Sequence, residues 1–478
     1  MPIEYLGLSS INGPLIVLEG VQDAFYDEIV EFIVGGNEKR IGRIIELYGD
    51  KAVIQVFEGS EGMSLVNTHT RLTGHPMEIG LSREMLGRTF NGIGQPIDDL
   101  GTIAARVRRD VNGLPLNPVK REYPRNYIRT GISAIDGLTT LIRGQKLPIF
   151  SGNGLPHDQL AAQIVKQASL GEDSGEEFAI VFAAMGVKHD VADFFRRTFE
   201  ESGVADHVAM FLNLANDPVV ERLITPKVAL TVAEYLAFEQ NMHILVILTD
   251  MTSFAEAMRE VSSSKGEIPS RKGFPGYLYS ELAAIYERAG IVEGAGGSVT
   301  QIPILTMPND DITHPIPDLT GYITEGQIVL DRNLNGQSIY PPISVLPSLS
   351  RLMKDGIGEG YTREDHQDLA NQLFSAYAKV GDARNLASVI GEDELSPIDK
   401  EYLAFGKEFE EKYIGQGLEE NRTIEETLDL GWELLGRLPR EELDRVNTKI
   451  LDKYYHPTKR DEGVTTSASP GSVANKEM

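Results

Sequence analysis

Cysteine is absent from the 478 residues, and tryptophan occurs only once. Without cysteine the chain can form no disulfide, thiolate metal site or thiol nucleophile, which argues against a secreted, disulfide-built protein. Long apolar runs are also missing: the most apolar, 242–248, has seven residues, whereas a membrane-spanning helix needs ~20. Residues 1–16 lack the charged start and apolar core of a signal peptide. We therefore expect a cytoplasmic protein that reaches a membrane only through partners.

Basic residues are fewer than acidic residues in this chain. Lys plus Arg total 45 against 71 for Asp plus Glu, a formal net charge of -26. Non-specific nucleic-acid binding depends on Lys and Arg that neutralise phosphates, so this balance argues against a nucleic-acid partner, although it leaves room for a local basic site. The hydrophobic share of 41% is that of a folded soluble protein. At ~150 residues per domain, the length predicts roughly three domains.

The first two zones of the chain differ in their pattern. Residues 1–73 consist of short β segments broken by glycine-containing turns, which predicts a small β barrel. Residues 74–351 alternate apolar, β-branched runs with amphipathic stretches such as 159–168 and 230–240, which predicts a doubly wound α/β domain. The segment 86–98, rich in Gly and punctuated by Pro, is expected to be a loop. The expected strands are 15–18, 28–34, 40–47, 52–57, 146–150, 179–183, 208–212, 244–248 and 302–306.

The last two zones contain no strand pattern. Residues 352–457 show helix-start signals: a cap at 362–365, an N-cap Ser396 before Pro397, and a capping box that begins at Thr423. These signals predict a helical bundle. Residues 458–478 are polar and rich in Ser, Gly and Pro, which predicts a disordered tail.

A glycine-containing loop follows the expected strand 146–150 and precedes a helix, the usual context of a phosphate-binding loop. Against the pattern GxxxxGK[ST], only Gly152 matches, and His157, Asp158 and Gln159 replace the second glycine, the lysine and the hydroxyl residue. The lysine supplies positive charge to the β- and γ-phosphates and the hydroxyl binds Mg²⁺, so this loop should not support ATP hydrolysis. The alternative, that 151–157 is only a tight strand-to-helix turn, stays open.

Two further residues are candidates for chemistry. Asp250 ends the apolar run 243–249, an arrangement that can hold Mg²⁺ through water or simply cap the next turn. Arg351 follows the Pro- and Ser-rich segment 340–350, which should be rigid and point it in one direction. An exposed arginine is most often a surface ion-pair partner, but it can also be an arginine finger that reaches a phosphate on a neighbouring subunit.

These pieces, in this order, resemble the nucleotide-binding subunits of rotary ATPases. The resemblance covers nearly the whole chain, and the segments 151–157, 182–186, 314–326 and 347–351 are similar to the non-catalytic B subunits of prokaryotic V/A-type complexes. Catalytic subunits of the family carry Gly-Glu-Arg where 186–188 reads Gly-Val-Lys, and valine cannot orient an attacking water. Ser344 also departs from the family's usual Asp or Asn, and this should alter only loop detail.

The resemblance implies a RecA-like P-loop NTPase core and a set of roles. Arg351 would be an arginine finger inserted in trans, and nucleotide contacts would come from Arg351, Tyr322, Ser348, Ser350, Gly152, Gly154 and Asp250. ATP or ADP would lie at the interface with a catalytic A subunit, with Mg²⁺ on the A side and no metal held by this chain. An alternating hexamer of three A and three B subunits would surround a central shaft and be held by a peripheral stalk on the cytoplasmic side of a proton- or sodium-translocating membrane sector.

Two other hypotheses remain. One is a pure scaffold subunit without nucleotide contact. The other is a catalytic hexameric ATPase of the same superfamily, which would require Lys and Ser or Thr at Asp158 and Gln159. Under the leading hypothesis the isolated chain does not hydrolyse ATP.

Overall fold

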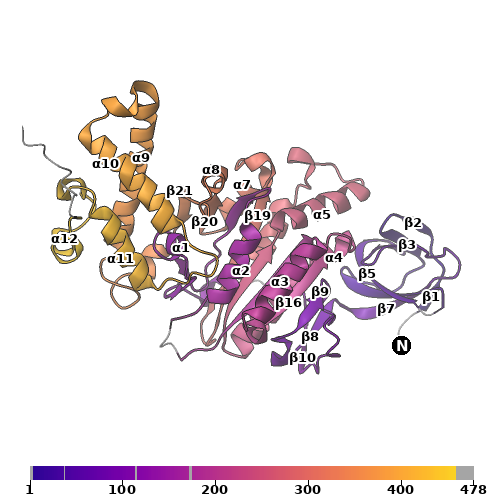
Figure 1. Cartoon of the computed structure of the whole chain (residues 1–478). Coiled ribbons are helices and arrows are strands. Elements are labelled where there is room, and N and C mark those ends of the chain that lie inside the picture. The colour runs from indigo at the N-terminus through magenta and orange to yellow at the C-terminus, as the bar shows by residue number, and fades with distance from the viewer. Residues whose placement is uncertain (1–3, 37, 114–115, 172–174, 459–478) are drawn as a thin grey trace, which may run out of the picture.

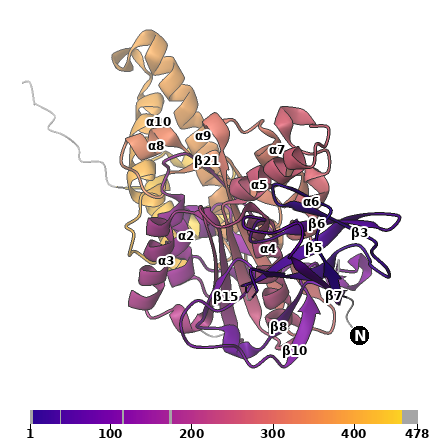
Figure 2. The ribbon, with the colours of Figure 1, turned by 90° about the vertical axis from the view of Figure 1, so that its right-hand side faces the viewer.

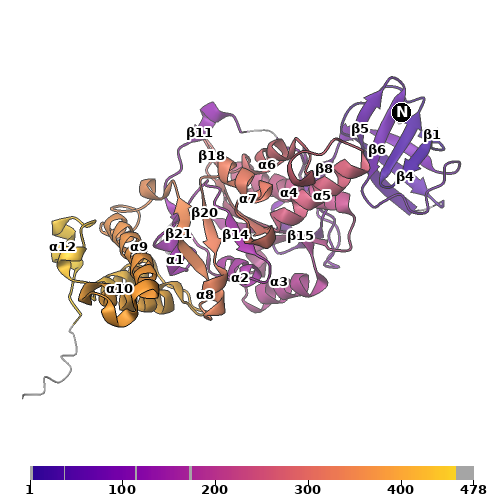
Figure 3. The same cartoon turned by 90° about the horizontal axis from the view of Figure 1, so that it is seen from above.

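The computed structural model describes residues 4–36, 38–113, 116–171 and 175–458. An N-terminal barrel lies at one end of the molecule, an α/β domain in the middle and a helical domain at the other end (Figures 1 and 3). Within the described ranges, no helix combines the length and the apolar character needed to cross a bilayer. Apart from residue 458, the predicted disordered tail lies outside the described residues.

The barrel is a seven-stranded antiparallel sheet in the order β1-β7-β4-β5-β6-β3-β2. Its edge strands β1 and β2 are consecutive in the chain and joined by residues 7–9, so the sheet curves back on itself. Alternating residues of β4, among them Val30, Phe32 and Val34, point into the barrel core. The strands are β1 (Glu4–Leu6), β2 (Ser10–Asn12), β3 (Leu15–Glu19), β4 (Glu28–Val34), β5 (Glu38–Tyr48), β6 (Lys51–Val56) and β7 (His69–Pro76).

The α/β domain is built on a sheet whose main path runs β21-β20-β14-β19-β17-β15-β16-β9. Neighbours along this path are parallel except β21, which is antiparallel to β20. The strands are β9 (Thr89–Asn91), β14 (Ile149–Gly152), β15 (Phe178–Val187), β16 (Val208–Leu214), β17 (His243–Thr249), β19 (Ser298–Met307), β20 (Gly326–Leu330) and β21 (Ile343–Ser350). Short pairs flank this sheet: β8 (Glu78–Leu81) with β10 (Val107–Asp110), β11 (Arg121–Glu122) with β18 (Gly290–Val292), and β12 (Tyr127–Ile128) with β13 (Leu141–Ile142).

Helices cover both faces of this sheet. In β15, Ile180 and Phe182 face the core formed with α2 and α3, whereas Val181 and Ala183 face the core formed with α4 and α5. The two layers lie on opposite sides of β15 in Figure 2. This double burial explains why the strands read as continuous apolar runs. The helices are α1 (Ser133–Asp136), α2 (His157–Gln167), α3 (His189–Glu201), α4 (Val219–Glu234), α5 (Met251–Ser264), α6 (Leu278–Tyr286), α7 (Pro315–Ile323) and α8 (Arg332–Gly336).

The C-terminal domain is helical and confirms two of the three predicted caps. Asp399 N–H donates to the Ser396 hydroxyl (3.2 Å), and Thr423 and Glu426 exchange both bonds of a capping box (2.7 and 3.1 Å). The helices are α9 (His366–Ile390), α10 (Pro397–Glu408), α11 (Ile424–Leu435) and α12 (Thr448–Tyr454).

Two local predictions were wrong. The cap expected at Thr362 is not formed: α9 begins at His366, and the Thr362 hydroxyl instead accepts from Gly358 N–H and contacts the His366 ring. The expected loop 86–98 contains β9, whose three residues gain backbone partners at the edge of the sheet beside β16. The helical stretch expected at 230–240 is confirmed as the end of a longer helix: α4 begins at Val219 and continues as a π-helix over Tyr235–Glu239.

His366 makes the junction between the α/β and helical domains sensitive to pH. Its buried imidazole Nε2 donates to the Gly137 carbonyl (3.0 Å), and burial lowers its pKa to about 4. As pH falls from 6.5 toward 4, the unfolded chain binds a proton that the folded chain excludes, so stability is lost. This loss is about 3 kcal/mol, since one pKa unit corresponds to roughly 1.4 kcal/mol.

The measurement is urea denaturation followed by Trp432 fluorescence, because this residue is the single tryptophan and lies in the helical domain. We expect the stability difference between wild type and His366→Gln to shrink between pH 6.5 and 4. A difference that stays constant over this range would contradict the assignment. Asp136, whose pKa burial raises to about 6, shifts stability in the opposite direction and cancels in the comparison.

Candidate functional site

The glycine loop joins β14, which ends at Gly152, to α2, which begins at His157. Leu155 N–H donates to the Gly152 carbonyl (3.1 Å), and His157 N–H donates to the Leu155 carbonyl (2.9 Å). Gly154 has a φ of +77°, which glycine adopts without strain in this tight turn. Two N–H groups that a phosphate-binding loop would offer to its ligand are therefore bonded inside the loop.

An ion pair closes over the same loop. Arg332, at the start of α8, contacts both carboxylate oxygens of Asp310 (2.7 and 2.9 Å) and donates to the Asn153 carbonyl (2.9 Å). A Cβ at Gly152 would lie 2.1 Å from Asp310 Oδ1. Gly152 is thus required for the close approach of a carboxylate, and this carboxylate lies against the loop.

The acidic residues near the loop make it unfavourable for anions. Burial raises the pKa of Asp158, the negative charges of Asp250 and Asp190 raise it further, and His157 opposes them. Asp250 Oδ1 accepts from the N–H groups of Thr252 (2.8 Å) and Thr306 (3.1 Å), so it caps α5 and ties α5 to β19. This geometry matches the capping interpretation of Asp250.

Val187, which stands where the resemblance implies a glutamate in catalytic subunits, ends β15 and packs against the apolar core beside α2 and α3. Its side chain can neither accept a proton nor orient water. At this end of the strands, Asp158 therefore offers no positive charge to a phosphate, and Val187 offers no group that orients water.

Arg351 lies at the opposite end of the sheet's parallel strands from the glycine loop. β20 runs parallel to β14, and Gly326 at its amino end pairs with Ser350 of β21. Arg351 directly follows Ser350, whereas Gly152 is at the carboxyl end of β14. Because parallel strands point the same way, Arg351 and the chain's own glycine loop lie at opposite ends of these strands.

The exposed Arg351 is held by the turn between α7 and β20. Its N–H donates to the Glu325 carbonyl (2.9 Å), and its Nη1 donates to the Thr324 carbonyl (3.2 Å). Tyr322, near the end of α7, is 76% exposed. β21, the edge strand of the sheet, also exposes Leu346 and Leu349. A cation and apolar groups therefore share this part of the surface.

Ser348 and Ser350 are buried and bonded within the chain. The Ser348 hydroxyl donates to the Ser344 carbonyl (2.5 Å) and accepts from Val329 N–H (2.9 Å). The Ser350 hydroxyl donates to the Thr140 carbonyl (2.9 Å) and accepts from Gln145 Nε2 (2.9 Å). In this structure both serines shape the strand that leads to Arg351 and do not present a free hydroxyl.

The structure thus separates the candidate residues into two groups. Gly152, Gly154 and Asp250 lie at the carboxyl ends of the parallel strands. The second group consists of Ser348 and Ser350 in β21, Arg351 directly after it, and Tyr322 in α7. Sequence reasoning missed two ion pairs, Asp310–Arg332 over the loop and Lys146–Glu325 behind Arg351. Lys146 gave a signal: a charged residue that directly precedes a buried apolar strand needs a partner.

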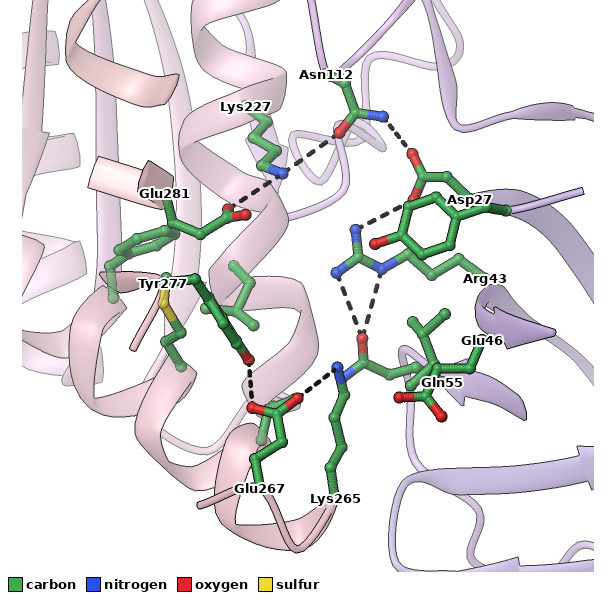
Figure 4. Close-up of a pocket in the computed structure, with 16 residues that line it drawn as sticks. Asp27, Arg43, Glu46, Gln55, Asn112, Lys227, Lys265, Glu267, Tyr277 and Glu281 are labelled. Atoms are coloured by element: carbon green, nitrogen blue, oxygen red, sulfur yellow. Dashed lines mark hydrogen bonds and ion pairs between the residues drawn. The ribbon is translucent and has the colours of Figure 1, made fainter. Parts of the chain in front are cut away.

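A cavity of about 450 Å³ lies away from both groups, between β5 and β6 of the barrel and helices α4, α5 and α6. Charged side chains pair around it, as Figure 4 shows: Arg43 with Asp27 (3.4 Å), Lys227 with Glu281 (3.7 Å) and Lys265 with Glu267 (3.8 Å). These pairs make it a polar interface between the barrel and the α/β domain.

Comparison with known families agrees with this architecture along the chain. Residues 8–74 match the β-barrel domain of the ATP synthase alpha/beta family, residues 131–350 match its nucleotide-binding domain, and residues 355–455 match the C-terminal domain of V and A type ATP synthase. The fold and these matches, which cover most of the chain, define a member of the ATP synthase alpha/beta family.

Individual relatives narrow this assignment. A V-type ATP synthase beta chain 2 of Clostridium tetani is 65% identical over 457 residues, 95% of this chain and 99% of the relative. The B subunit of the A-type ATP synthase of Sulfolobus acidocaldarius is 58% identical over 458 residues, 96% and 98% of the two chains. The solved ATP synthase subunit NeqB from Nanoarcheaum equitans shares 40% identity with a TM-score of 0.72, covering 89% of this chain and all of that one. The chain belongs to the family of V- and A-type ATP synthase B subunits, or beta chains.

Proposed function

We propose that this chain is the non-catalytic partner in the head of a rotary ATPase, where Arg351 completes the ATP site of a neighbouring catalytic A subunit. The guanidinium would stabilise the negative charge that spreads over the γ-phosphoryl oxygens in the transition state. Its planar group and permanent charge suit it to that role better than a lysine.

The position of Arg351 carries this proposal. The residue follows the last residue of β21, which is the outermost strand of the sheet. It lies at the opposite end of the parallel strands from the chain's own glycine loop. It therefore cannot serve a nucleotide at that loop, and the exposed Tyr322, Leu346 and Leu349 provide apolar surface that a second subunit would cover.

The wider assembly follows from the family. We propose an alternating ring of three A and three B subunits with ATP or ADP at the A–B interface and Mg²⁺ on the A side. The ring would contact a central shaft and a peripheral stalk at the cytoplasmic face of an ion-translocating membrane sector. The residues of this chain fit that division: at the loop, Asp158 and Gln159 replace the lysine and hydroxyl that would hold phosphate and Mg²⁺.

The isolated chain is expected to bind ATP with a Kd no tighter than about 1 mM, corresponding to roughly -4 kcal/mol. Two loop N–H groups are already bonded, the Arg332 guanidinium beside the loop is neutralised by Asp310, and Asp158 stands where a lysine would attract phosphate. Isothermal titration calorimetry with MgATP measures this directly, with ATP hydrolysis assayed on the same sample. Micromolar binding or turnover by the isolated chain would contradict the division of roles.

A photoreactive ATP analogue tests the interface. In a reconstituted A–B complex it should label this chain near Arg351, and labelling should vanish when the A subunit is omitted. A pure scaffold subunit would remain unlabelled in both samples, which would reject the trans arrangement.

A further inference from the structure

The turn that holds Arg351 is itself fastened to one buried lysine. Lys146, which directly precedes the apolar segment leading into β14, is only 4% exposed. Its Nζ lies 2.8 Å from Glu325 Oε1, and its backbone N–H donates to Glu325 Oε2 (3.0 Å). Glu325 N–H in turn donates to the Lys146 carbonyl (3.2 Å). Both the side chain and the backbone of Glu325 are therefore held by a single residue.

The other side of Lys146 is also anchored. Its Nζ lies 3.0 Å from Glu287 Oε1, and Glu287 Oε2 pairs with Arg121 (3.2 Å). A buried ammonium group without partners is costly, so these two carboxylates restrict Lys146 to one position. The contacts form a continuous chain from Arg121 through Glu287 and Lys146 to the turn at Glu325.

Glu325 passes this constraint to the arginine. Its carbonyl accepts from Arg351 N–H (2.9 Å), and the adjacent Thr324 carbonyl accepts from the Arg351 side chain (3.2 Å). Gln145, the neighbour of Lys146, donates to the Glu325 carbonyl (3.3 Å) and to the Ser350 hydroxyl (2.9 Å). The segment 145–146 therefore bonds both to Glu325, which accepts from Arg351, and to Ser350, which directly precedes Arg351.

We propose that Lys146 is a positioning residue for Arg351: through Glu325 it fixes the direction in which the guanidinium leaves the edge of the sheet. This inference rests on the proposed function, because it assigns a task to Lys146 only if Arg351 acts on a neighbouring subunit's ATP. Lys146 itself is buried behind the turn and would touch no nucleotide.

The test uses the full chain reconstituted with its catalytic A subunit. Lys146→Met removes the charge at similar length, and we expect kcat to fall about 10- to 100-fold, since a misplacement near 1 Å can cost about 10²-fold. The KM for ATP should stay unchanged, because the arginine acts mainly in the transition state. In an Arg351→Ala background the same substitution should lower kcat no further.

Conservative and control variants separate positioning from general stability. Lys146→Arg keeps the charge and should recover most of the lost kcat, and Glu325→Gln should reproduce the defect if Lys146→Met fails to assemble. Arg288→Met breaks another buried ion pair, that of Arg288 (3% exposed) with Glu234 (2.6 Å), and should leave kcat per assembled complex unchanged.

Two outcomes would overturn the inference: an unchanged kcat in Lys146→Met and Glu325→Gln, or the same fold loss with and without Arg351. Failure of the proposed function looks different, because Arg351→Ala alone would then leave turnover intact.

Discussion

Replacing Arg351 with alanine is expected to lower the kcat of the reconstituted A–B complex by about 10³- to 10⁵-fold, the range by which arginine fingers accelerate phosphoryl transfer. The KM for ATP should change little, since the lost contact forms fully only in the transition state. Steady-state ATPase assays on assembled complexes measure both constants. Size-exclusion chromatography should show the complex still forming, because Tyr322 and the exposed leucines of β21 remain.

Two variants control this experiment. Arg351→Lys keeps the positive charge but loses the planar fork, so its activity should lie between those of wild type and the alanine variant. Arg332→Ala removes another exposed arginine at the opposite edge of the sheet, beside the glycine loop, and should leave kcat unchanged. Turnover that is equal in wild type and Arg351→Ala would reject the arginine-finger proposal.

Phe409→Ala is expected to destabilise the helical domain by about 3–5 kcal/mol, the usual cost of truncating a buried phenylalanine. The Phe409 ring is fully buried and packs against Phe405 (5.6 Å between ring centroids), Tyr413 (5.1 Å) and Tyr377 (5.1 Å). Urea denaturation monitored by Trp432 fluorescence reports on this domain selectively, since Trp432 lies in α11.

The matched control is Phe374→Ala in the neighbouring helix α9. Its ring is 43% exposed, so its removal should change the free energy of unfolding by less than about 1 kcal/mol. Equal shifts in the two urea midpoints would show that the aromatic stack around Phe409 does not dominate the core of this domain.

Local chemistry made much of the fold predictable. The strand expected at 28–34 matches β4 residue for residue, and the helix starts at Ser396 and Thr423 have the expected cap bonds. These features depend on neighbours within a few residues, so the sequence specifies them directly. Motif spacing alone shows that Asp158 replaces the lysine of a phosphate-binding loop, whereas the glutamate expected at Val187 is implied only by the family resemblance.

The failures occur where distant segments compete. Thr362 has a good capping side chain, but its hydroxyl bonds to Gly358 and His366, and α9 starts later. β9 forms within an expected loop because the edge of β16 offers backbone partners from more than 100 residues away. The nucleotide contact predicted for Ser348 and Ser350 is not one of these failures: it stays a prediction, and the structure adds that both hydroxyls are bonded internally.

The sequence by itself determined the zones of the fold, the family resemblance and the presence of Asp158 and Gln159 where a phosphate-binding loop has lysine and a hydroxyl residue, because composition, periodicity and motif spacing are local properties. Only the tertiary structure decided where Arg351 lies relative to that loop and what holds it. The strand directions of β14, β20 and β21 place Arg351 and the loop at opposite ends of the strands. The buried Lys146, far earlier in the chain, holds the turn at Glu325 that contacts Arg351. Such placements depend on strand pairing and burial between distant segments, which spacing along the chain does not encode.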